Sequence, residues 1–171
     1  MSDTLYIVVP CYNEEEVLPE TSKRLKEKLE SLIKDSKISK QSRIMFVNDG
    51  SFDCTRDIIN KLHNESSLFT GINLSKNRGH QNALLAGLMT AKKYADVTIS
   101  MDADLQDDIE AIDLMLDKYY SGCDIVYGVR SKRKKDSIFK RITAEGPRYV
   151  FMSVNGKALD SHEKRRPGHS P

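Results

Sequence analysis

The amino-acid sequence predicts an α/β protein with a mostly parallel central sheet covered by helices on both faces. Two observations carry this prediction. Short β-branched runs alternate with longer segments of helical period, and the first run, Leu5 to Val9, is almost wholly apolar. A strand with both sides buried shows such a run, because neither side faces water. At 171 residues the chain can bury a core without disulfides, so a single domain is expected.

The expected strands cover residues 5–9, 44–47, 71–74, 97–101 and 125–127. A helix follows the first strand, with proline at its start and one apolar face made of Thr21, Leu25, Leu29, Leu32 and Ile33. Asp53 is expected to cap a second helix that carries Ile58, Ile59 and Leu62. A third helix over residues 80–93 is expected to face the core with Leu84, Leu85 and Leu88, and a fourth covers residues 109–120.

The periodic pattern ends near Gly146. Residues 1–145 are therefore expected to form the folded domain, and residues 146–171, rich in charge, proline and glycine, a disordered or atypical tail that adds little to the fold. A sheet of this kind usually continues with further strands and helices, so the domain is expected to be shortened.

Charge and composition limit the partners of the chain. Lys and Arg total 27 against 25 Asp and Glu, and the net charge of +2 gives no reason to expect nucleic acid as a partner. The segment 130–141 is locally basic, which fits either a solvated loop or peripheral contact with an anionic substrate or membrane face. Three widely spaced cysteines and no apolar stretch of about 20 residues indicate a cytoplasmic protein, at the membrane face if the basic segment binds there.

Polar residues collect just past three of the expected strands, as Pro10 to Glu14, Asn48 to Ser51 and Asp102 to Asp104. In parallel sheets ligands bind at the carboxyl ends of the strands, so this placement predicts a site. Each group alone also fits ordinary loop chemistry, because Asn-Asp-Gly-Ser is good turn material and a single Asp-x-Asp is common.

Two carboxylates at a strand end, Asp102 and Asp104, lie close enough in sequence to share a divalent cation that bridges to a diphosphate. Asp104 is the expected direct ligand, and Asp102 binds through water or lies nearer a ribose. Tyr12 could stack on a base, while Glu14 and Asp49 accept hydrogen bonds from base or ribose. The alternative is a pair of solvated carboxylates and a half-buried loop tyrosine.

Five motifs follow one another in order: Val9-Pro10-Cys11-Tyr12-Asn13-Glu14, Val47-Asn48-Asp49-Gly50-Ser51, Asn77-Arg78-Gly79-His80, Asp102-Ala103-Asp104-Leu105-Gln106-Asp107 and Gly128-Val129-Arg130. Together they resemble the motifs of the family 2 glycosyltransferases, especially the dolichyl-phosphate mannose synthase and bactoprenol glucosyltransferase branch. The resemblance covers residues 4–145 and implies a GT-A (Rossmann-like) three-layer fold. Asp108 departs from the proline that often follows Leu-Gln-Asp in this family.

The resemblance also implies the roles of individual residues. The nucleoside site would be lined by Pro10, Tyr12, Glu14, Val47 and Asp49, and the metal and diphosphate site by Asp102, Ala103, Asp104 and Gln106. Asp102, Asp104 and Arg130 would be the catalytic set, with Arg130 beside the phosphates. Lys76, Arg78 and His80 either assist near the sugar or play ordinary structural parts.

The implied reaction is hexose transfer, with inversion, from a UDP- or GDP-linked sugar to a polyprenyl phosphate in cell-wall or glycan biosynthesis, assisted by Mg²⁺ or Mn²⁺. A polyprenyl phosphate arrives ionised, since its second pKa is about 6, and needs little help from a base. Two alternatives remain: a truncated, noncatalytic nucleotide-binding module, and a sugar nucleotidyltransferase. The second would have a glycine-rich loop where this chain has Pro10 to Glu14.

Overall fold

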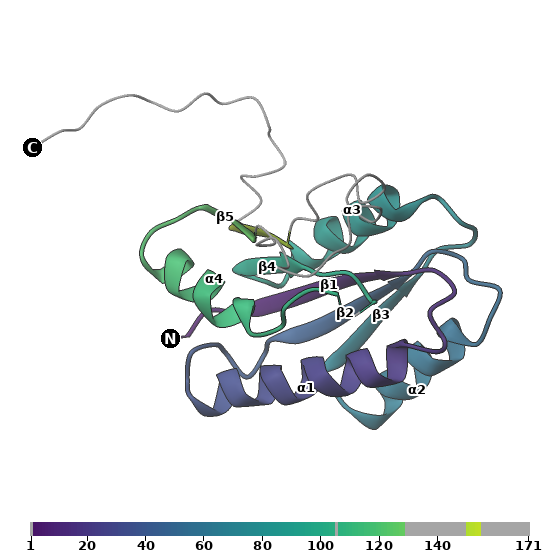
Figure 1. The fold of residues 1–171 in the computed structure, drawn as a ribbon, viewed down its shortest axis with the longest axis horizontal. Helices are drawn as coiled ribbons and strands as arrows, with labels where there is room; N and C mark the ends of the chain where they lie inside the picture. Colours follow the sequence, from purple (N-terminus) through teal and green to yellow (C-terminus); the bar gives the residue numbers. More distant parts are fainter. Residues whose placement is uncertain (1, 105, 129–149, 155–171) are drawn as a thin grey trace, which may run out of the picture.

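The computed structural model describes residues 2–104, 106–128 and 150–154 (Figure 1). Each expected strand and helix is present, and the α/β class is confirmed. In chain order the elements are β1 (Leu5–Cys11), α1 (Leu18–Lys34), β2 (Arg43–Asn48), α2 (Thr55–Glu65), β3 (Phe69–Asn73), α3 (His80–Ala91), β4 (Val97–Ser100), α4 (Ala111–Tyr120), β5 (Ile125–Gly128) and β6 (Val150–Val154).

The strands form one sheet in the order β3-β2-β1-β4-β6-β5. β1 pairs in parallel with both β2 and β4, and β2 pairs in parallel with β3. β6 is antiparallel to both of its neighbours, β4 and β5. This strand falls within residues 146–171, which were expected to add little to the fold, and residues 150–154 instead form an interior strand of the sheet.

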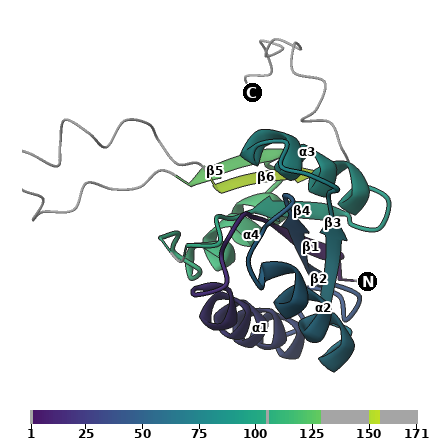
Figure 2. The same ribbon diagram turned by 90° about the vertical axis from the view of Figure 1, so that its right-hand side faces the viewer.

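Helices cover both faces of the sheet, as expected (Figure 2). On one face the core joins α1, α2 and α4 through residues such as Leu25, Ile59 and Ile112. On the other face α3 packs on Val8 and Val47. Alternate residues of β1 serve the two faces, because successive side chains of a strand point to opposite sides. The result is a three-layer fold.

The face that α3 turns to the sheet consists mostly of small residues. Ala83, Gly87 and Ala91 are buried there together with Leu88, whereas Leu85 is 45% exposed. The expectation that Leu85 faces the core is therefore wrong. A Cβ on Gly87 would lie only 2.4 Å from Val8 Cγ1, so the helix axis approaches the sheet too closely for a large side chain there.

β1 lies where the chain reverses its direction of winding, between β2 on one side and β4 on the other. β4 ends at Ser100, and the Met101 N–H donates to the Val8 carbonyl at 3.1 Å. β1 continues to Cys11 but carries Pro10, which has no N–H to extend pairing toward β4. Pairing between the two strands therefore ends here, at the switch point where α/β sheets commonly bind ligands.

Ion pairs at the surface link α1 and the turn after it to α4. Lys28 and Lys37 both contact the Asp113 carboxylate, which fixes α1 and the turn after it against α4. Across the described ranges, the helices are too short or too polar for any of them to cross a bilayer.

Candidate active site

A cavity of about 320 Å³ lies at the carboxyl ends of β1 and β4. Its walls come from three places: the end of β1 and the loop after it, the first residue of α3, and the loop after β4. The lining residues are Pro10, Glu14, His80, Asp102, Ala103 and Asp104. Five of these six were predicted as nucleotide or metal residues, and His80 was predicted as an assisting or structural residue.

The loop that carries Asp102 and Asp104 is held from both sides. Thr21 of α1 is buried, and its hydroxyl donates to the Ala103 carbonyl at 2.7 Å. The Asp107 carboxylate accepts a hydrogen bond from the Asp102 N–H at 3.0 Å. Sequence reasoning assigned neither supporting role. Asp107 lies in the Leu-Gln-Asp motif, but Thr21 comes from 82 residues away and gave no signal beyond its place on the apolar face of α1.

Carboxylates dominate the electrostatics of the cavity. Partial burial raises the pKa of Glu14, and the nearby Asp104 and Asp102 carboxylates raise it further by repulsion. The Nε2 atom of His80 lies 3.7 Å from Asp102 Oδ1. Oxygen-rich, negatively charged surroundings of this kind suit Mg²⁺ or Mn²⁺.

The acidic side chains of the cavity could supply part of the coordination of such a cation. Among the described residues, no three His, Cys, Asp or Glu side chains are grouped so as to hold a metal ion. Asp102 and Asp104 both line the cavity, and together with a diphosphate and water they could hold such a cation.

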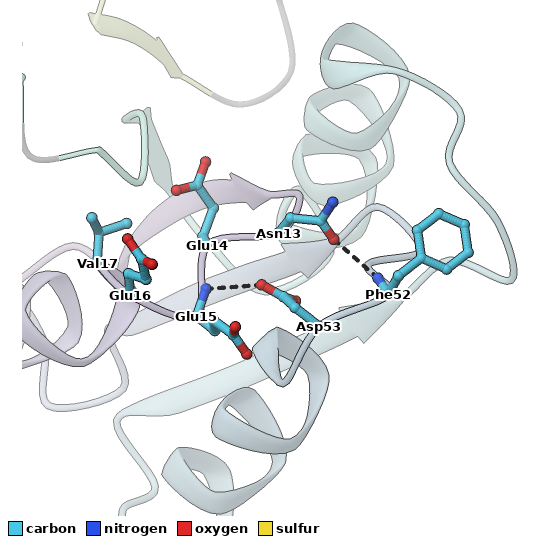
Figure 3. A pocket seen from close by; sticks show the side chains of 7 residues that line it. All are labelled: Asn13, Glu14, Glu15, Glu16, Val17, Phe52 and Asp53. Atoms are coloured by element: carbon cyan, nitrogen blue, oxygen red, sulfur yellow. Dashed lines mark hydrogen bonds between the residues drawn. The ribbon is translucent and has the colours of Figure 1, made fainter.

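A second, wider pocket of about 440 Å³ adjoins the loop after β1 and is lined by Asn13, Glu14, Glu15, Glu16, Val17, Phe52 and Asp53 (Figure 3). Hydrogen bonds between backbone N–H groups and carboxylates join the loop after β1 to the loop before α2. The Glu15 N–H donates to Asp53 at 3.1 Å, and the Cys54 N–H donates back to the Glu15 carboxylate at 2.9 Å. Asp53 also accepts from the Thr55 N–H at 3.0 Å, although the N-cap residue of α2 is Cys54 and not Asp53, which had been expected there.

A hydrogen bond between the same two segments also fixes the backbone of Glu14. Its N–H donates to the Thr55 hydroxyl at 2.8 Å, and Asn13 adopts a left-handed conformation with φ of 55° that turns the chain at this point. Asparagine tolerates this conformation better than most residues. Figure 3 shows Glu14 and Glu15 projecting to opposite sides of the loop, so only Glu14 serves the first cavity.

Four of the predicted nucleoside or diphosphate residues do not line the first cavity: Tyr12, Val47, Asp49 and Gln106. Tyr12 is 39% exposed and packs edge-on against Phe52, with 6.5 Å between ring centroids. The side chain of Val47 is fully buried under α3. Gln106 is exposed, and its N–H donates to the Asp104 carboxylate at 3.1 Å.

Asp49, predicted to read the base or ribose, is only 2% exposed. Its Oδ1 accepts from the Arg78 N–H at 2.7 Å, and its Oδ2 accepts from the Gly79 N–H at 2.8 Å. The carboxylate is thus directed into the loop that precedes α3. Sequence reasoning missed this contact because its partners are backbone groups 29 and 30 residues away.

The remaining predicted residues lie apart from the cavity or outside the described ranges. Lys76 lines a small pocket of about 230 Å³ between the loops after β2 and β3, which also contains Arg56. Arg78 is exposed. Arg130 and the basic segment 130–141 lie outside the described residues.

Comparison with known proteins places the chain among glycosyltransferases. Residues 6–166 match the family described as "Glycosyl transferase family 2". The chain is 53% identical over 159 residues to the uncharacterized glycosyltransferase YkoT of Bacillus subtilis, covering 92% of this chain and 47% of that protein. It is 40% identical over 139 residues to a bactoprenol glucosyl transferase of Shigella phage SfV, covering 81% of this chain and 43% of the phage protein. It thus spans about half the length of these relatives.

Solved structures share the fold. Residues 1–349 of S. aureus TarS in complex with UDP match with a TM-score of 0.55 and 20% identity, covering 92% of this chain and 48% of that one. Glucosyl-3-phosphoglycerate synthase from Mycobacterium tuberculosis, in complex with Mn²⁺, UDP and phosphoglyceric acid, matches with a TM-score of 0.50 and 17% identity. The match covers 72% of this chain and 42% of that one. At these identities the likeness establishes the GT-A fold alone. With the family match over most of its length, the chain belongs to the family 2 glycosyltransferases.

Proposed function

We propose that this chain is the donor-binding part of a hexosyltransferase that transfers a sugar, with inversion, from a UDP- or GDP-linked donor to a polyprenyl phosphate. The observation that carries the proposal is the cavity at the switch point, where Asp102 and Asp104 face Glu14 and His80. Family membership supports the reaction class. The bactoprenol glucosyl transferase of Shigella phage SfV supports a polyprenyl phosphate as the acceptor, since its name refers to this lipid carrier.

Asp102 and Asp104 are the residues that would hold Mg²⁺ or Mn²⁺, with Asp104 as the direct ligand. Bound there, the cation would supply positive charge against the departing diphosphate. The chain itself orients the donor. Thr21 and Asp107 fix the carboxylate loop, and Glu14 and Pro10 form the opposite wall. Arg130 is proposed to lie beside the phosphates.

The acceptor decides whether a base is needed. A sugar hydroxyl would need a carboxylate to remove its proton, whereas a phosphate monoester is already ionised at neutral pH, with a second pKa of about 6. Glu14, Asp102 and Asp104 are all engaged on the donor side in this proposal. A lipid phosphate therefore fits the site better. The basic segment 130–141 would attract such an acceptor or an anionic membrane surface.

Calorimetry with UDP and GDP, in the presence of Mn²⁺ or of a chelator, tests donor binding. Without a cation, the diphosphate would be repelled by three carboxylates. We expect the chelator to weaken binding of the preferred nucleotide by at least about tenfold, and Asp104→Asn to do the same in Mn²⁺. Binding that is equally tight in the chelator would contradict the proposal.

Glu16→Gln is the matched control for Asp104→Asn. It removes one negative charge from an exposed residue that lines only the neighbouring pocket, so nucleotide affinity should change little. Transfer of radiolabelled sugar to a short polyprenyl phosphate, with a full-length relative as positive control, tests the acceptor. Transfer to a sugar hydroxyl but not to the lipid phosphate would refute that part of the proposal.

A further inference from the structure

We propose that Phe52 contacts the nucleobase of the donor and forms, together with Tyr12, an aromatic corner at the base end of the site. The inference rests on the proposed function, since it adds a binding residue to the same donor site. Tyr12 was predicted from the sequence to stack on a base. Phe52 directly follows the motif from Val47 to Ser51, and the sequence assigned it no role.

The exposure of Phe52 is the first argument. The residue is 89% exposed, more than any other large hydrophobic residue that the structure describes. A ring in this state adds almost nothing to the core, and it could gain the free energy of burial only from a ligand or partner. Single exposed apolar residues are common on protein surfaces, so the surroundings of Phe52 decide whether the exposure has a use.

The loop after β1 holds Phe52 beside Tyr12. The Phe52 N–H donates to the side-chain oxygen of Asn13 at 3.0 Å, and the Asn13 N–H donates to the Ser51 hydroxyl at 3.0 Å. The rings of Tyr12 and Phe52 lie 6.5 Å apart between centroids, at an interplanar angle of 73°. Two rings at such an angle form a corner, in which a flat base that stacks on one ring meets the other with its edge.

The polarity of the adjoining pocket matches that of a nucleotide. Figure 3 shows the carboxylate of Glu14 on one side of Asn13 and the ring of Phe52 on the other. Glu14 also lines the donor cavity with Asp102 and Asp104, where the cation and the diphosphate are proposed to bind. A nucleoside diphosphate is charged at one end and aromatic at the other. With its diphosphate beside the carboxylates, its base would lie toward Phe52.

Calorimetry with two kinds of ligand tests this contact. Mn²⁺-dependent binding of UDP or GDP, whichever the wild-type chain binds more tightly, is compared with that of inorganic pyrophosphate, which has no base. Phe52→Ala should weaken the nucleotide about fivefold to tenfold and leave pyrophosphate unchanged, because contact with an aromatic side chain contributes to base binding. Phe52→Tyr keeps the ring and should restore the affinity. Unchanged nucleotide affinity in Phe52→Ala, or an equal loss for pyrophosphate, would overturn the proposal.

Tyr94→Ala is the matched control. Tyr94 is also an exposed aromatic residue that contacts a tyrosine, since it is 64% exposed and its ring lies 6.4 Å from that of Tyr6. It precedes β4, whereas the cavity lies past the end of β4, so it occupies the opposite edge of the sheet. Tyr94→Ala should change neither affinity. A loss of nucleotide affinity as large as that in Phe52→Ala would point to a general effect of aromatic truncation and count against the contact.

Fluorescence gives a readout at the corner itself. The chain contains no tryptophan, so Phe52→Trp would place a single indole there. The nucleotide should quench the indole emission of Phe52→Trp and pyrophosphate should not, because only the nucleotide brings an aromatic base to the indole. Neither ligand should quench the emission of Tyr94→Trp. Equal signals from nucleotide and pyrophosphate in Phe52→Trp would contradict a contact with the base.

A double variant separates direct contact from mere support of Tyr12. If Phe52 touches the base, adding Phe52→Ala to Tyr12→Ala should lower nucleotide affinity further. Equal affinities of the double variant and Tyr12→Ala would mean that Phe52 only orients Tyr12, and the proposal would be wrong. If the wild-type chain bound no nucleotide, the proposed function and this inference would both fail. If it bound nucleotide and Phe52→Ala bound it equally well, this inference alone would fail.

Discussion

Gly87 of α3 lies directly against Val8 of β1, and a Cβ on Gly87 would meet Val8 Cγ1 at 2.4 Å and Val47 Cγ2 at 2.8 Å. Both valines are fully buried on β1 and β2 and can move little. The contact sets the distance between α3 and the sheet. It also sets the place of His80, seven residues earlier on the same helix.

Gly87→Ala should therefore destabilise the protein, although alanine favours helices over glycine by about 1 kcal/mol. Overpacking of a buried site costs about 1–3 kcal/mol, which we expect to exceed the gain in propensity. Chemical denaturation gives the free energy of unfolding. Val8→Ala opens space beside the new methyl group, so the cost of Gly87→Ala should shrink in that background. An unchanged cost would show that Val8 is not the obstacle.

The same contact explains why sequence reasoning misplaced Leu85. Helical period and residue size both favour leucines as core residues, and they placed Leu84, Leu85 and Leu88 inside. Leu88 is buried, but the close approach at Gly87 turns the small residues inward and leaves Leu85 exposed. Which face of a short, apolar helix meets the sheet depends on the sheet, and local periodicity does not contain that information.

The strands of the parallel half were predictable because each is a local apolar run. β6 was not predicted, although Val150 to Val154 is itself a short apolar run. Proline, glycine and charge on both sides favoured a tail, and its antiparallel place between β4 and β5 depends on contacts distant in sequence. The residues of the candidate site also fall into a group that local sequence predicts and a group that depends on distant contacts. Asp102 and Asp104 follow a strand end and were predictable, whereas the burial of Asp49 depends on a loop 29 residues away.

Asp113 is expected to stabilise the fold in a pH-dependent manner. Hydrogen bonds from Lys28 and then from Lys37 hold the pKa of Asp113 below its ordinary value. An acid with a depressed pKa stabilises the folded state above its unfolded pKa of about 4, and this contribution is lost as the pH falls through the folded pKa. Asp113→Asn should thus lower the Tm at pH 7 clearly more than at pH 3.

Glu30→Gln is the control for that experiment. It also removes a helix-surface carboxylate that contacts a lysine, but Lys26 and Glu30 are both exposed and 3.9 Å apart. Exposed pairs of this kind contribute little, so the Tm should barely change at either pH. If Asp113→Asn lowered the Tm by the same amount at pH 3 and at pH 7, the charge of Asp113 would not be the cause of the lost stability.

Glu14 should have the opposite effect on stability. Burial, followed by repulsion from Asp104, raises the pKa of Glu14. A carboxyl with a raised folded-state pKa costs stability at neutral pH, and the cost disappears as the pH falls below its unfolded pKa of about 4. Glu14→Gln should therefore stabilise the protein at pH 7, by up to about 1 kcal/mol because the group is partly solvated.

Thermal unfolding across pH 3–7 measures this effect, with Glu16→Gln as the matched charge removal at an exposed position of the same loop. The Glu14 variant should converge on wild type near pH 3, and the Glu16 variant should follow wild type throughout. A stability gain of the same size in both variants would indicate a general charge effect and not the crowding of Glu14 with Asp104. Such a site residue, which costs stability, is typical of functional positions.

The central place of β6 gives the last prediction. Ser153 pairs with Thr98 of β4 on one side and with Ile125 of β5 on the other, so its strand connects the parallel half of the sheet to β5. Proline within an interior strand removes a ladder hydrogen bond and leaves a buried carbonyl without its partner, at a cost of about 1–3 kcal/mol. Ser153→Pro should therefore lower the free energy of unfolding by about that amount, whereas Ser153→Thr, which keeps the N–H and favours strands, should not. Because β4 leads directly into Asp102 and Asp104, Ser153→Pro should also weaken Mn²⁺-dependent nucleotide binding. Wild-type stability in the proline variant would mean that residues 150–154 are dispensable for the sheet, as the sequence alone had predicted.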